Sequence, residues 1–295
     1  MEIKSKLVSD LRAATGVGMM DCKKALVEAG GDFEEAKKIL RKKGLAAAAS
    51  KAGRSTSEGL VVAHVTLPAA VLLEVNCETD FVARTEDFRR FADTLAERIA
   101  AHAAFGEATT GSAADVAGLS WPREASVADA VAQLIGTLKE NIQIRRFARL
   151  VPRSGEHFAS YVHGNGRIGV LVGMPGGNDE LRKDIAMHVA ASDPRFASRA
   201  EVTPEILATE KEIARAQATA AGKPANVVER IADGKVEKFY QETVLTEQAF
   251  VKEPEKTVGQ VVVERAGKEA LGLRFVRFKL GEVLGRPSEG EAAIA

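Results

Sequence analysis

The order of the predicted elements repeats once along the chain, and this repeat limits the fold more than any other feature. Each occurrence has two short β-runs rich in valine and leucine, a tight connection between them, and an amphipathic helix after the second run. The repeat predicts two related α+β halves built on antiparallel sheets. The two occurrences are Leu60–Leu67, Ala70–Val75 and a helix from about Thr85, and Phe158–Val162, Ile168–Val172 and a helix over Asp179–Ala191.

An insertion interrupts the second half. Residues 203–221 are polar and favour a helix, Gly222-Lys223-Pro224 breaks it, and a second helix is predicted over Ala225–Tyr240. Two helices around such a turn form an antiparallel helical hairpin. Because the pair is polar, we expect it to project from the body. After it, Thr257–Ala266 favours a helix and Leu271–Leu280 favours a strand.

Three short helical patterns open the chain. Their apolar residues recur at helical spacing, and the patterns end at glycine-rich turns, the third one before Gly44. This arrangement predicts a compact three-helix bundle. The small and polar stretch over 45–59 is interpreted as a linker, and the aperiodic stretch over 103–122 as an exposed, poorly packed loop.

The formal charge of the 295 residues is zero, with 41 basic and 41 acidic side chains, but the charge is unevenly distributed. Residues 1–54 carry a balance of +5 and the remainder carries −5. The sequence therefore describes a small basic module attached to an acidic body, and the overall balance discourages a strongly nucleic-acid-binding protein.

Several functional classes are disfavoured by what the sequence lacks. No run approaches the roughly 18 apolar residues of a membrane span, and the N-terminus has no secretory stretch, so we expect a cytoplasmic protein. Cys22 and Cys77 have no CxxC or Cys/His spacing, which argues against a zinc site. The stretch Gly164–Gly169 fits G-x-G-x-x-G, but strand follows it where a dinucleotide site needs a helix. We expect no cofactor, no metal and no enzyme.

The informative stretch is Glu74–Arg84, which follows a predicted strand and precedes a predicted helix. In one interpretation, Thr79 or Asp80 caps a short helix and Phe81 packs beneath it. In the other, a rigid turn presents a carboxylate and an aromatic ring to a partner, a composition typical of interface hot spots. Spacing alone leaves both interpretations open.

Two further positions carry the same ambiguity. Met19 and Met20 are adjacent at the start of the second helix, so both cannot face a core, and an exposed thioether suits an adaptable binding surface. His163 lies at a hairpin tip, where it is either a solvated turn residue or a contact residue.

Two long segments resemble a known family in the right order. Leu11–Leu26 (LRAATGVGMMDCKKAL) looks like the N-terminal signature of bacterial translation elongation factor Ts, and Glu74–Arg84, with Thr79-Asp80-Phe81-Val82 at its centre, resembles the second signature. Glu140–Arg146 and His163–Gly169 are similar to further family stretches. The resemblance covers roughly residues 1–280.

This resemblance implies a guanine-nucleotide exchange factor for elongation factor Tu, which makes or breaks no covalent bond. It implies a ubiquitin-associated-like three-helix domain, a duplicated α+β core and an inserted antiparallel coiled-coil hairpin. In the family, the turn matched by Thr79, Asp80, Phe81 and Val82 enters the GTPase and disturbs its magnesium and phosphate site. By the same matching, Met19, Met20 and His163 contact the partner.

The expected domains follow from these elements. They are a three-helix domain with linker at 1–54, a core N-subdomain at 55–140, a core C-subdomain at 141–202 and 241–281, the hairpin at 203–240, and a disordered tail at 282–295.

Two positions depart from the family pattern, and two other functional classes stay open. Lys139 stands where family members have glycine, and Lys252 replaces an apolar residue.

An RNA-binding protein using the basic module and a passive peptide-binding scaffold are the alternatives to an exchange factor. A homodimer through the helical hairpin is a further possibility.

Overall fold

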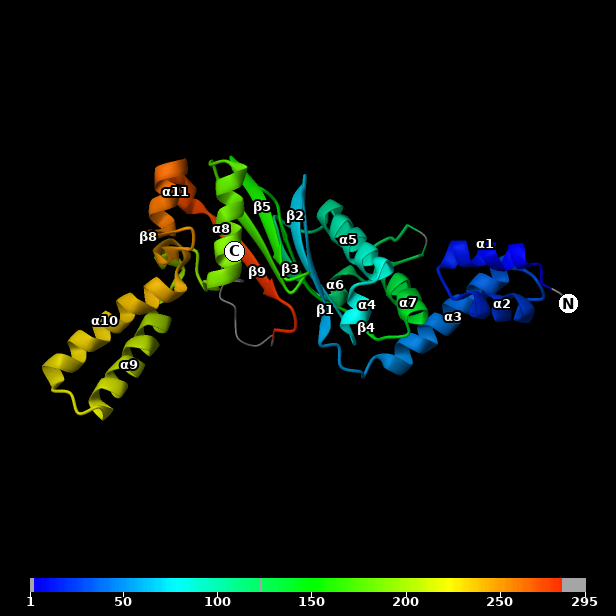
Figure 1. The fold of residues 1–295 in the computed structure, drawn as a ribbon, viewed down its shortest axis with the longest axis horizontal. Coiled ribbons are helices and arrows are strands. Elements are labelled where there is room, and N and C mark those ends of the chain that lie inside the picture. The colour runs from blue at the N-terminus through cyan, green and yellow to red at the C-terminus, as the bar shows by residue number, and fades with distance from the viewer. Residues whose placement is uncertain (1–2, 123, 283–295) are drawn as a thin grey trace. The chain divides into compact units, whose positions relative to one another are not determined.

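The computed structural model describes residues 3–122 and 124–282 (Figure 1). The chain has the mixed α+β fold that the sequence predicts, with small sheets and an N-terminal helical bundle. The predicted tail at 282–295 lies, from residue 283 on, outside the described residues. The described residues form two compact units: those of unit 1 fall within Met1–Val62, Leu73–Ile99 and Gly111–Phe147, and those of unit 2 within Ala63–Leu72, Ala100–Thr110 and Ala148–Ala295.

The N-terminal bundle consists of α1 (Ser5–Thr15), α2 (Met19–Glu28) and α3 (Phe33–Lys51), which confirms the three predicted helices. Gly16 ends α1 in the left-handed conformation, and the Asp32 carboxylate caps α3 by accepting a hydrogen bond from Glu35 N at 2.8 Å. The apolar positions pack into one small core. Its buried members are Val8, Leu11, Val17, Cys22, Ala25, Leu26, Ala36 and Leu40.

The prediction that the third helix stops at Gly44 is wrong, because α3 continues to Lys51 through half of the expected linker. Alanine-rich sequence has the highest helix propensity, which outweighs one glycine. Gly44 also has a packing role against α7 (Val127–Leu138). A Cβ at Gly44 would lie 3.1 Å from the Ala132 carbonyl oxygen, so the missing side chain allows the close crossing of the two helices.

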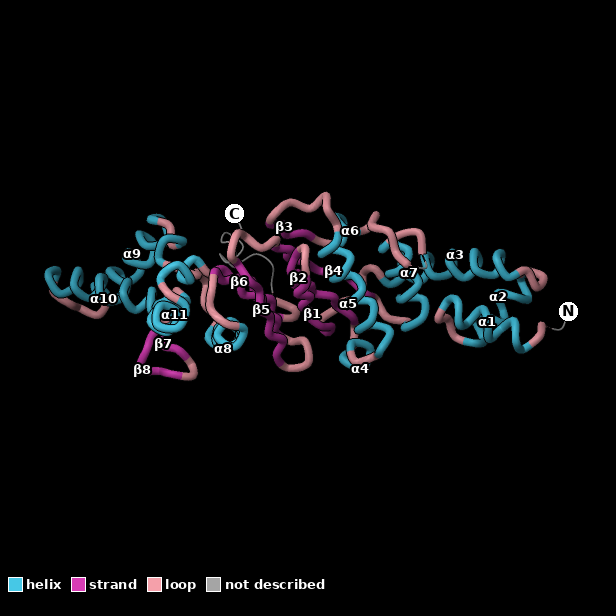
Figure 2. The backbone as a smooth tube through the Cα atoms, turned by 90° about the horizontal axis from the view of Figure 1, so that it is seen from above, coloured by secondary structure: helices cyan, strands magenta, loops and turns pink. Residues whose placement is uncertain are grey.

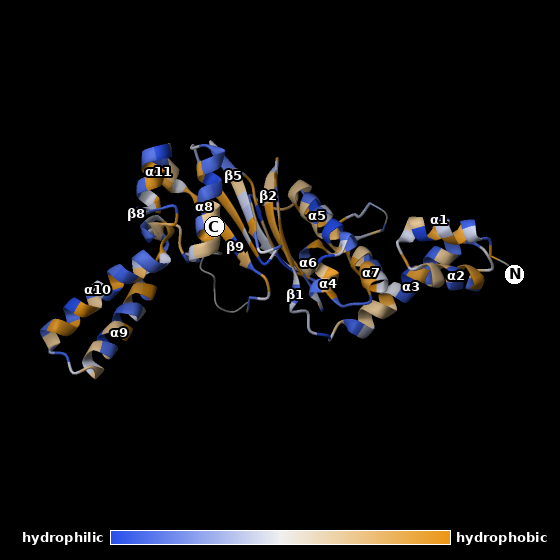
Figure 3. Cartoon of the chain, viewed as in Figure 1, coloured by the Kyte–Doolittle hydropathy of each residue, from blue (hydrophilic) through white to orange (hydrophobic). Residues whose placement is uncertain are grey.

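The first sheet has the strand order β1-β2-β4-β3. Every residue of β2 is buried, and Figure 3 shows this strand as predominantly hydrophobic. The buried Glu74 carboxylate on β2 accepts from Arg146 Nε at 2.8 Å, so that charge is paired. The elements of this region are β1 (Glu58–Thr66), β2 (Ala69–Cys77), α4 (Asp80–Ala83), α5 (Glu86–Ala101), β3 (Ala108–Gly111), α6 (Ala113–Val116) and β4 (Ile142–Leu150).

The stretch predicted to be a poorly packed loop at 103–122 is more ordered than expected. It contains β3 and α6, and it buries Val116 completely. Trp121 packs against Phe91 with ring centroids 5.0 Å apart and the ring planes tilted by 35°. Isolated large side chains, rather than a periodic pattern, hold this segment in place, which explains why periodicity missed it.

The second sheet belongs to unit 2 and has the order β5-β6-β9. Its strands β5 (Glu156–His163), β6 (Ile168–Pro175) and β9 (Arg274–Lys279) pair antiparallel, and α8 (Asp179–Ser192) packs against them. At the start of β5, the buried Glu156 carboxylate accepts hydrogen bonds from Nε and Nη2 of Arg274 at 2.8 and 2.7 Å.

The inserted helices are α9 (Pro204–Ala220) and α10 (Ala225–Thr243), which run side by side as an antiparallel pair (Figure 1). The buried residues of the two helices are three alanines, Val228 and Phe239, and the ion pairs Lys211–Asp233 and Arg215–Glu229 join the helices at 2.6 and 2.7 Å. The predicted helical hairpin is confirmed.

The elements that follow complete unit 2. The small hairpin β7 (Ala249–Phe250) and β8 (Glu253–Thr257) was not predicted, and it lies beside α11 (Val258–Ala266) (Figure 2). Short 3₁₀ turns occur at Arg199–Glu201, Leu245–Glu247 and Lys268–Gly272. Buried His188 on α8 holds this region, since its Nε2 lies 2.9 Å from Gln248 Oε1 and its Nδ1 accepts from Val251 N at 3.3 Å.

Replacing Gly44 with valine is expected to lower the free energy of unfolding by about 1–3 kcal/mol, because the new side chain would be forced against the α7 backbone. Urea unfolding followed by the fluorescence of Trp121, the sole tryptophan, measures the change. Gly234→Ala in α10 is the control: its Cβ meets nothing within 4 Å, so it should be neutral or stabilising. Equal stabilities for Gly44→Val and the wild type would contradict the close crossing.

Unit 2 is expected to lose stability as the pH falls below about 6.5, the ordinary pKa of histidine. Burial lowers the pKa of His188 in the fold, partly offset by its bond to Gln248, so the unfolded chain binds the proton first and acid favours unfolding. Unfolding free energies of the wild type and of His188→Gln, compared at about pH 7.5 and 5.5, test this. The wild type should show the larger decrease; parallel pH profiles would contradict it.

Candidate partner-binding site

The informative stretch forms a turn between the buried strand β2 and the one-turn helix α4. Thr79 is the N-cap residue, and its Oγ1 accepts from Val82 N at 3.4 Å. The predicted cap is therefore present. Of the two interpretations of this stretch, the one in which Phe81 packs beneath the helix is wrong, because Val82 and Ala83 occupy the inward face and the Phe81 ring is 79% exposed.

Asp80 lies beside Phe81 in the first turn of α4, with its carboxylate 2.7 Å from Arg84 Nη2. Both side chains are substantially exposed, so the pair contributes only about 0.3–0.5 kcal/mol. Such a weak intramolecular pair leaves the Asp80 carboxylate available to a competing partner at small cost. The turn thus presents an aromatic ring and an acidic group next to each other.

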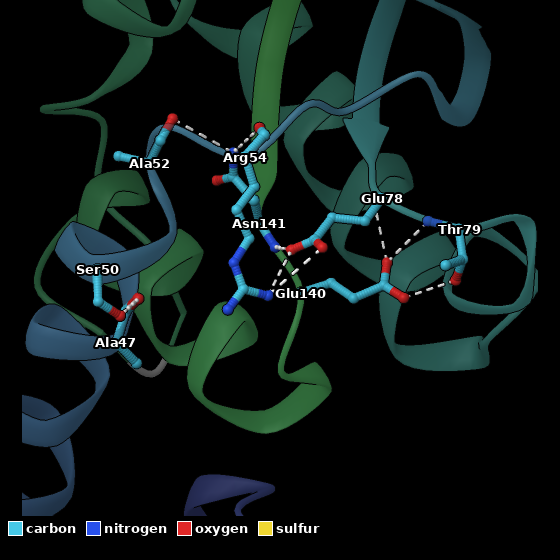
Figure 4. Close-up of polar contacts among 8 residues, drawn as sticks. All are labelled: Ala47, Ser50, Ala52, Arg54, Glu78, Thr79, Glu140 and Asn141. Atoms are coloured by element: carbon cyan, nitrogen blue, oxygen red, sulfur yellow. Dashed lines mark hydrogen bonds and ion pairs between the residues drawn. The ribbon is translucent and has the colours of Figure 1, made fainter.

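The backbone of the turn is held by Glu140, the second residue after α7 (Figure 4). One carboxylate oxygen of Glu140 accepts from Glu78 N at 3.1 Å and from Thr79 N at 3.0 Å. The other oxygen accepts from the Thr79 hydroxyl at 2.6 Å. Hydrogen bonds to an ionised acceptor are stronger than neutral ones, so this carboxylate fixes the turn firmly.

In a second set of hydrogen bonds, the segment after α7 donates and Glu78 accepts. The Glu78 carboxylate accepts from Asn141 N at 2.6 Å and lies 3.4 Å from Arg54 Nη1. Buried Asn141 donates its side-chain amide to the Arg54 carbonyl at 2.9 Å, which fastens the end of the linker (Figure 4). Residues 78–79 and 140–141 therefore hold each other through their side chains and backbones.

Lys139 connects the same segment to the helical bundle. Its φ is +64°, a left-handed conformation that costs a non-glycine residue roughly 1–2 kcal/mol. A glycine at this position would adopt the same conformation without that cost. The Lys139 side chain also lies 3.3 Å from the Asp21 carboxylate in the first turn of α2.

Met19 and Met20 begin α2, next to Asp21. The inward face of this helix is taken by Cys22, Ala25 and Leu26, and both methionines are largely exposed. Unit 1 therefore contains both the turn at 79–82 and the methionine pair, and Lys139–Asn141 contacts the neighbourhood of each.

His163 belongs to unit 2, where it is the exposed last residue of β5. Its Nδ1 lies 3.0 Å from the Tyr161 hydroxyl, and the following turn uses positive φ at Gly164, Asn165 and Gly166. GNGRIG is thus a hairpin turn, as the sequence indicated. Of the departures noted above, Lys252 pairs with the buried Asp184 at 2.6 Å.

Sequence reasoning attached no role to Glu140, Asn141 or Glu78. Glu140 and Asn141 stood inside a family-like stretch, but their bonds reach residues about 60 positions away. Only the pairing of distant segments brings them to the turn, so local periodicity held no signal for them.

The two cysteines are structural thiols. Burial raises the pKa of Cys77 to about 12, and its thiol donates to the Thr79 carbonyl at 3.1 Å. Burial also raises the pKa of Cys22, which donates to the Val17 carbonyl at 3.3 Å. Neither thiol is therefore activated as a nucleophile.

Within the described ranges 3–122 and 124–282, no group of three or more His, Cys, Asp or Glu side chains is arranged to hold a metal ion. The same residues contain no helix that is both long and apolar enough to cross a membrane.

Comparisons with known proteins show the family of this chain. The family model for Elongation factor TS matches residues 78–282. Elongation factor Ts of Methylococcus capsulatus is 47% identical over 291 residues, covering 96% of this chain and 93% of that protein. Elongation factor Ts of Thioalkalivibrio sulfidiphilus is 44% identical over 296 residues, covering 99% and 97%. That of Clostridium botulinum (strain Eklund 17B / Type B) is 42% identical, covering 98% and 97%.

These findings show that the chain is a translation elongation factor. At this identity over nearly the full length of both chains, it belongs to the elongation factor Ts family. Membership implies a nucleotide-exchange role toward elongation factor Tu in translation, which is not catalysis of a chemical reaction.

Neither cysteine is expected to react with a thiol reagent in the native chain, because the thiolate form is suppressed and both sulfurs are buried. Titration with a chromogenic disulfide at about pH 8 should release no signal until denaturant is added, and then two equivalents. Fast reaction of one thiol in the native chain would contradict the placement of Cys22 or Cys77.

Proposed function

We propose that this chain binds elongation factor Tu·GDP and promotes GDP release by inserting the turn at Thr79–Val82 beside the magnesium and phosphate site. The observation that carries the proposal is the 79% exposed Phe81 on a turn whose backbone is fixed by Glu140. A large aromatic side chain held out in water on a rigid support is typical of an interface anchor.

The energetics of exchange set what the turn must supply. An exchange factor binds the empty GTPase better than the nucleotide-bound one, and the coupling is reciprocal. Weakening GDP binding about a thousandfold requires roughly 4 kcal/mol of differential binding. Full burial of a phenylalanine supplies about 1.5–3 kcal/mol. Phe81 therefore accounts for a large part of the required differential binding if its pocket exists only in the distorted GTPase.

The other predicted contacts complete the proposal. Asp80 exchanges its weak pairing with Arg84 for interactions near the displaced cation. Met19 and Met20 contact the nucleotide domain from residues 1–54, and His163 contacts the partner from the subdomain at 141–202 and 241–281. The basic N-terminal module accelerates encounter through its charge.

The remaining predictions concern other partners. A homodimer through the hairpin at 203–240 stays a prediction, for which the exposed Ile213 and Val227 offer apolar surface. The RNA-binding and scaffold alternatives predict binding without faster GDP release, so the assay below separates them from exchange.

Phe81→Ala is expected to slow catalysed GDP release about tenfold to a hundredfold at subsaturating exchange factor, the effect of losing about 1.5–3 kcal/mol. Stopped-flow release of a fluorescent GDP analogue from elongation factor Tu measures the rate. Leu67→Ala is the matched control, because Leu67 is 85% exposed but lies outside the predicted contacts. Unchanged release with folded Phe81→Ala would overturn the assignment of the turn.

A further inference from the structure

The turn that carries Phe81 is too short to orient itself. Helix α4 has four residues, and an isolated single turn of helix is unstable because nucleation fixes several residues for one hydrogen bond. The direction of the exposed ring therefore depends on groups outside α4. Inward packing of Val82 and Ala83 supports one side, and Glu140 holds the backbone at the N-terminal end.

The Glu140 contacts act on the atoms that precede the helix. Its carboxylate accepts the amides of Glu78 and Thr79, which are the last two before Asp80. It also accepts the Thr79 hydroxyl, whose oxygen in turn accepts from Val82 N inside α4. The carboxylate, hydroxyl and amide form one chain of hydrogen bonds, and such chains reinforce their members.

Glu140 itself cannot move freely. The residue before it is set in a left-handed conformation, and the residue after it is held by the Glu78 carboxylate and the Arg54 carbonyl (Figure 4). The reference point for the turn is therefore the end of α7. The same end contacts α2 through Lys139 and Asp21, next to Met19 and Met20.

We infer that Glu140 is a positioning residue for nucleotide exchange: its carboxylate holds the Thr79–Val82 turn in the orientation in which Phe81 and Asp80 engage the GTPase. The inference rests on the proposed function. Glu140 acts through the length and hydrogen-bonding capacity of its side chain, and its charge does not act directly on the bound nucleotide or magnesium.

Three substitutions separate the effect of the length and hydrogen bonding of Glu140 from the effect of its charge. Glu140→Gln keeps the length, and its carbonyl oxygen can accept both amides while its amide group donates to Thr79 Oγ1. Glu140→Asp keeps the charge but is one methylene shorter, so it cannot reach all three donors. Glu140→Ala removes both properties. Glu97→Ala on α5 is the matched control, since Glu97 is an exposed acidic residue of the same unit.

The experiment measures the rate of fluorescent-GDP release from elongation factor Tu over a range of exchange-factor concentrations. Positioning predicts that the saturating rate falls on the order of tenfold to a hundredfold for Ala and Asp, whereas Gln stays within about threefold of the wild type. The half-saturating concentration should change less than the saturating rate, because the other contacts remain.

Amide hydrogen exchange supplies a readout that a change in global stability alone does not move. The amides of Glu78 and Thr79 should lose protection in the Ala and Asp variants and keep it in Gln, while protection elsewhere in β2 is unchanged. If Glu140→Ala does not fold, the exchange rates of the Asp and Gln variants still show whether the length or the charge of the side chain matters.

Two results would overturn the inference: a saturating rate in the folded Ala variant equal to that of Glu97→Ala, or an Asp variant that is active while the Gln variant is not. If the wild type itself fails to accelerate GDP release, the proposed function fails instead. The wild-type measurement in the same assay therefore distinguishes the two failures.

Discussion

Three consecutive residues after α7 hold the part of unit 1 that bears the proposed contacts. Lys139 pairs with α2, Glu140 accepts the amides that precede α4, and Asn141 fastens the end of the linker. A strand that ends in a turn leaves backbone amides without ladder partners, and buried or half-buried amides need an acceptor. The Glu140 carboxylate is that acceptor for the turn that follows β2.

This constraint explains how an aromatic side chain can be held in solvent without being lost to the core. Phe81 buries little surface on folding, since it is 79% exposed, and the turn is stabilised by Glu140, Val82 and Ala83. The hydrophobic free energy of the ring therefore stays available for binding. Pre-orientation also removes the entropy cost that a flexible loop would pay on association.

The sequence predicted many elements because their signals are local. Strand β4 follows the predicted β-run at Ile142–Leu150, and the caps at Asp32 and Thr79 match their residue types. The errors have different causes. Helix α3 extends past Gly44 because the alanine-rich sequence that follows favours a helix and because Gly44 packs closely against α7. The packing of Trp121 against Phe91 depends on a residue in another element, which no local period encodes.

By itself the sequence determined the α+β class, the three-helix N-terminal bundle, the helical hairpin and the family. These depend on the hydrophobic period, on turn residues and on long signatures, all of which are formed by residues close together in the sequence. Only the tertiary structure decided that Phe81 points into solvent and that Glu140 holds its turn. The reason is physical: the hydrogen bond from Thr79 N to the Glu140 carboxylate joins groups 61 positions apart along the chain, which only folding brings to 3.0 Å.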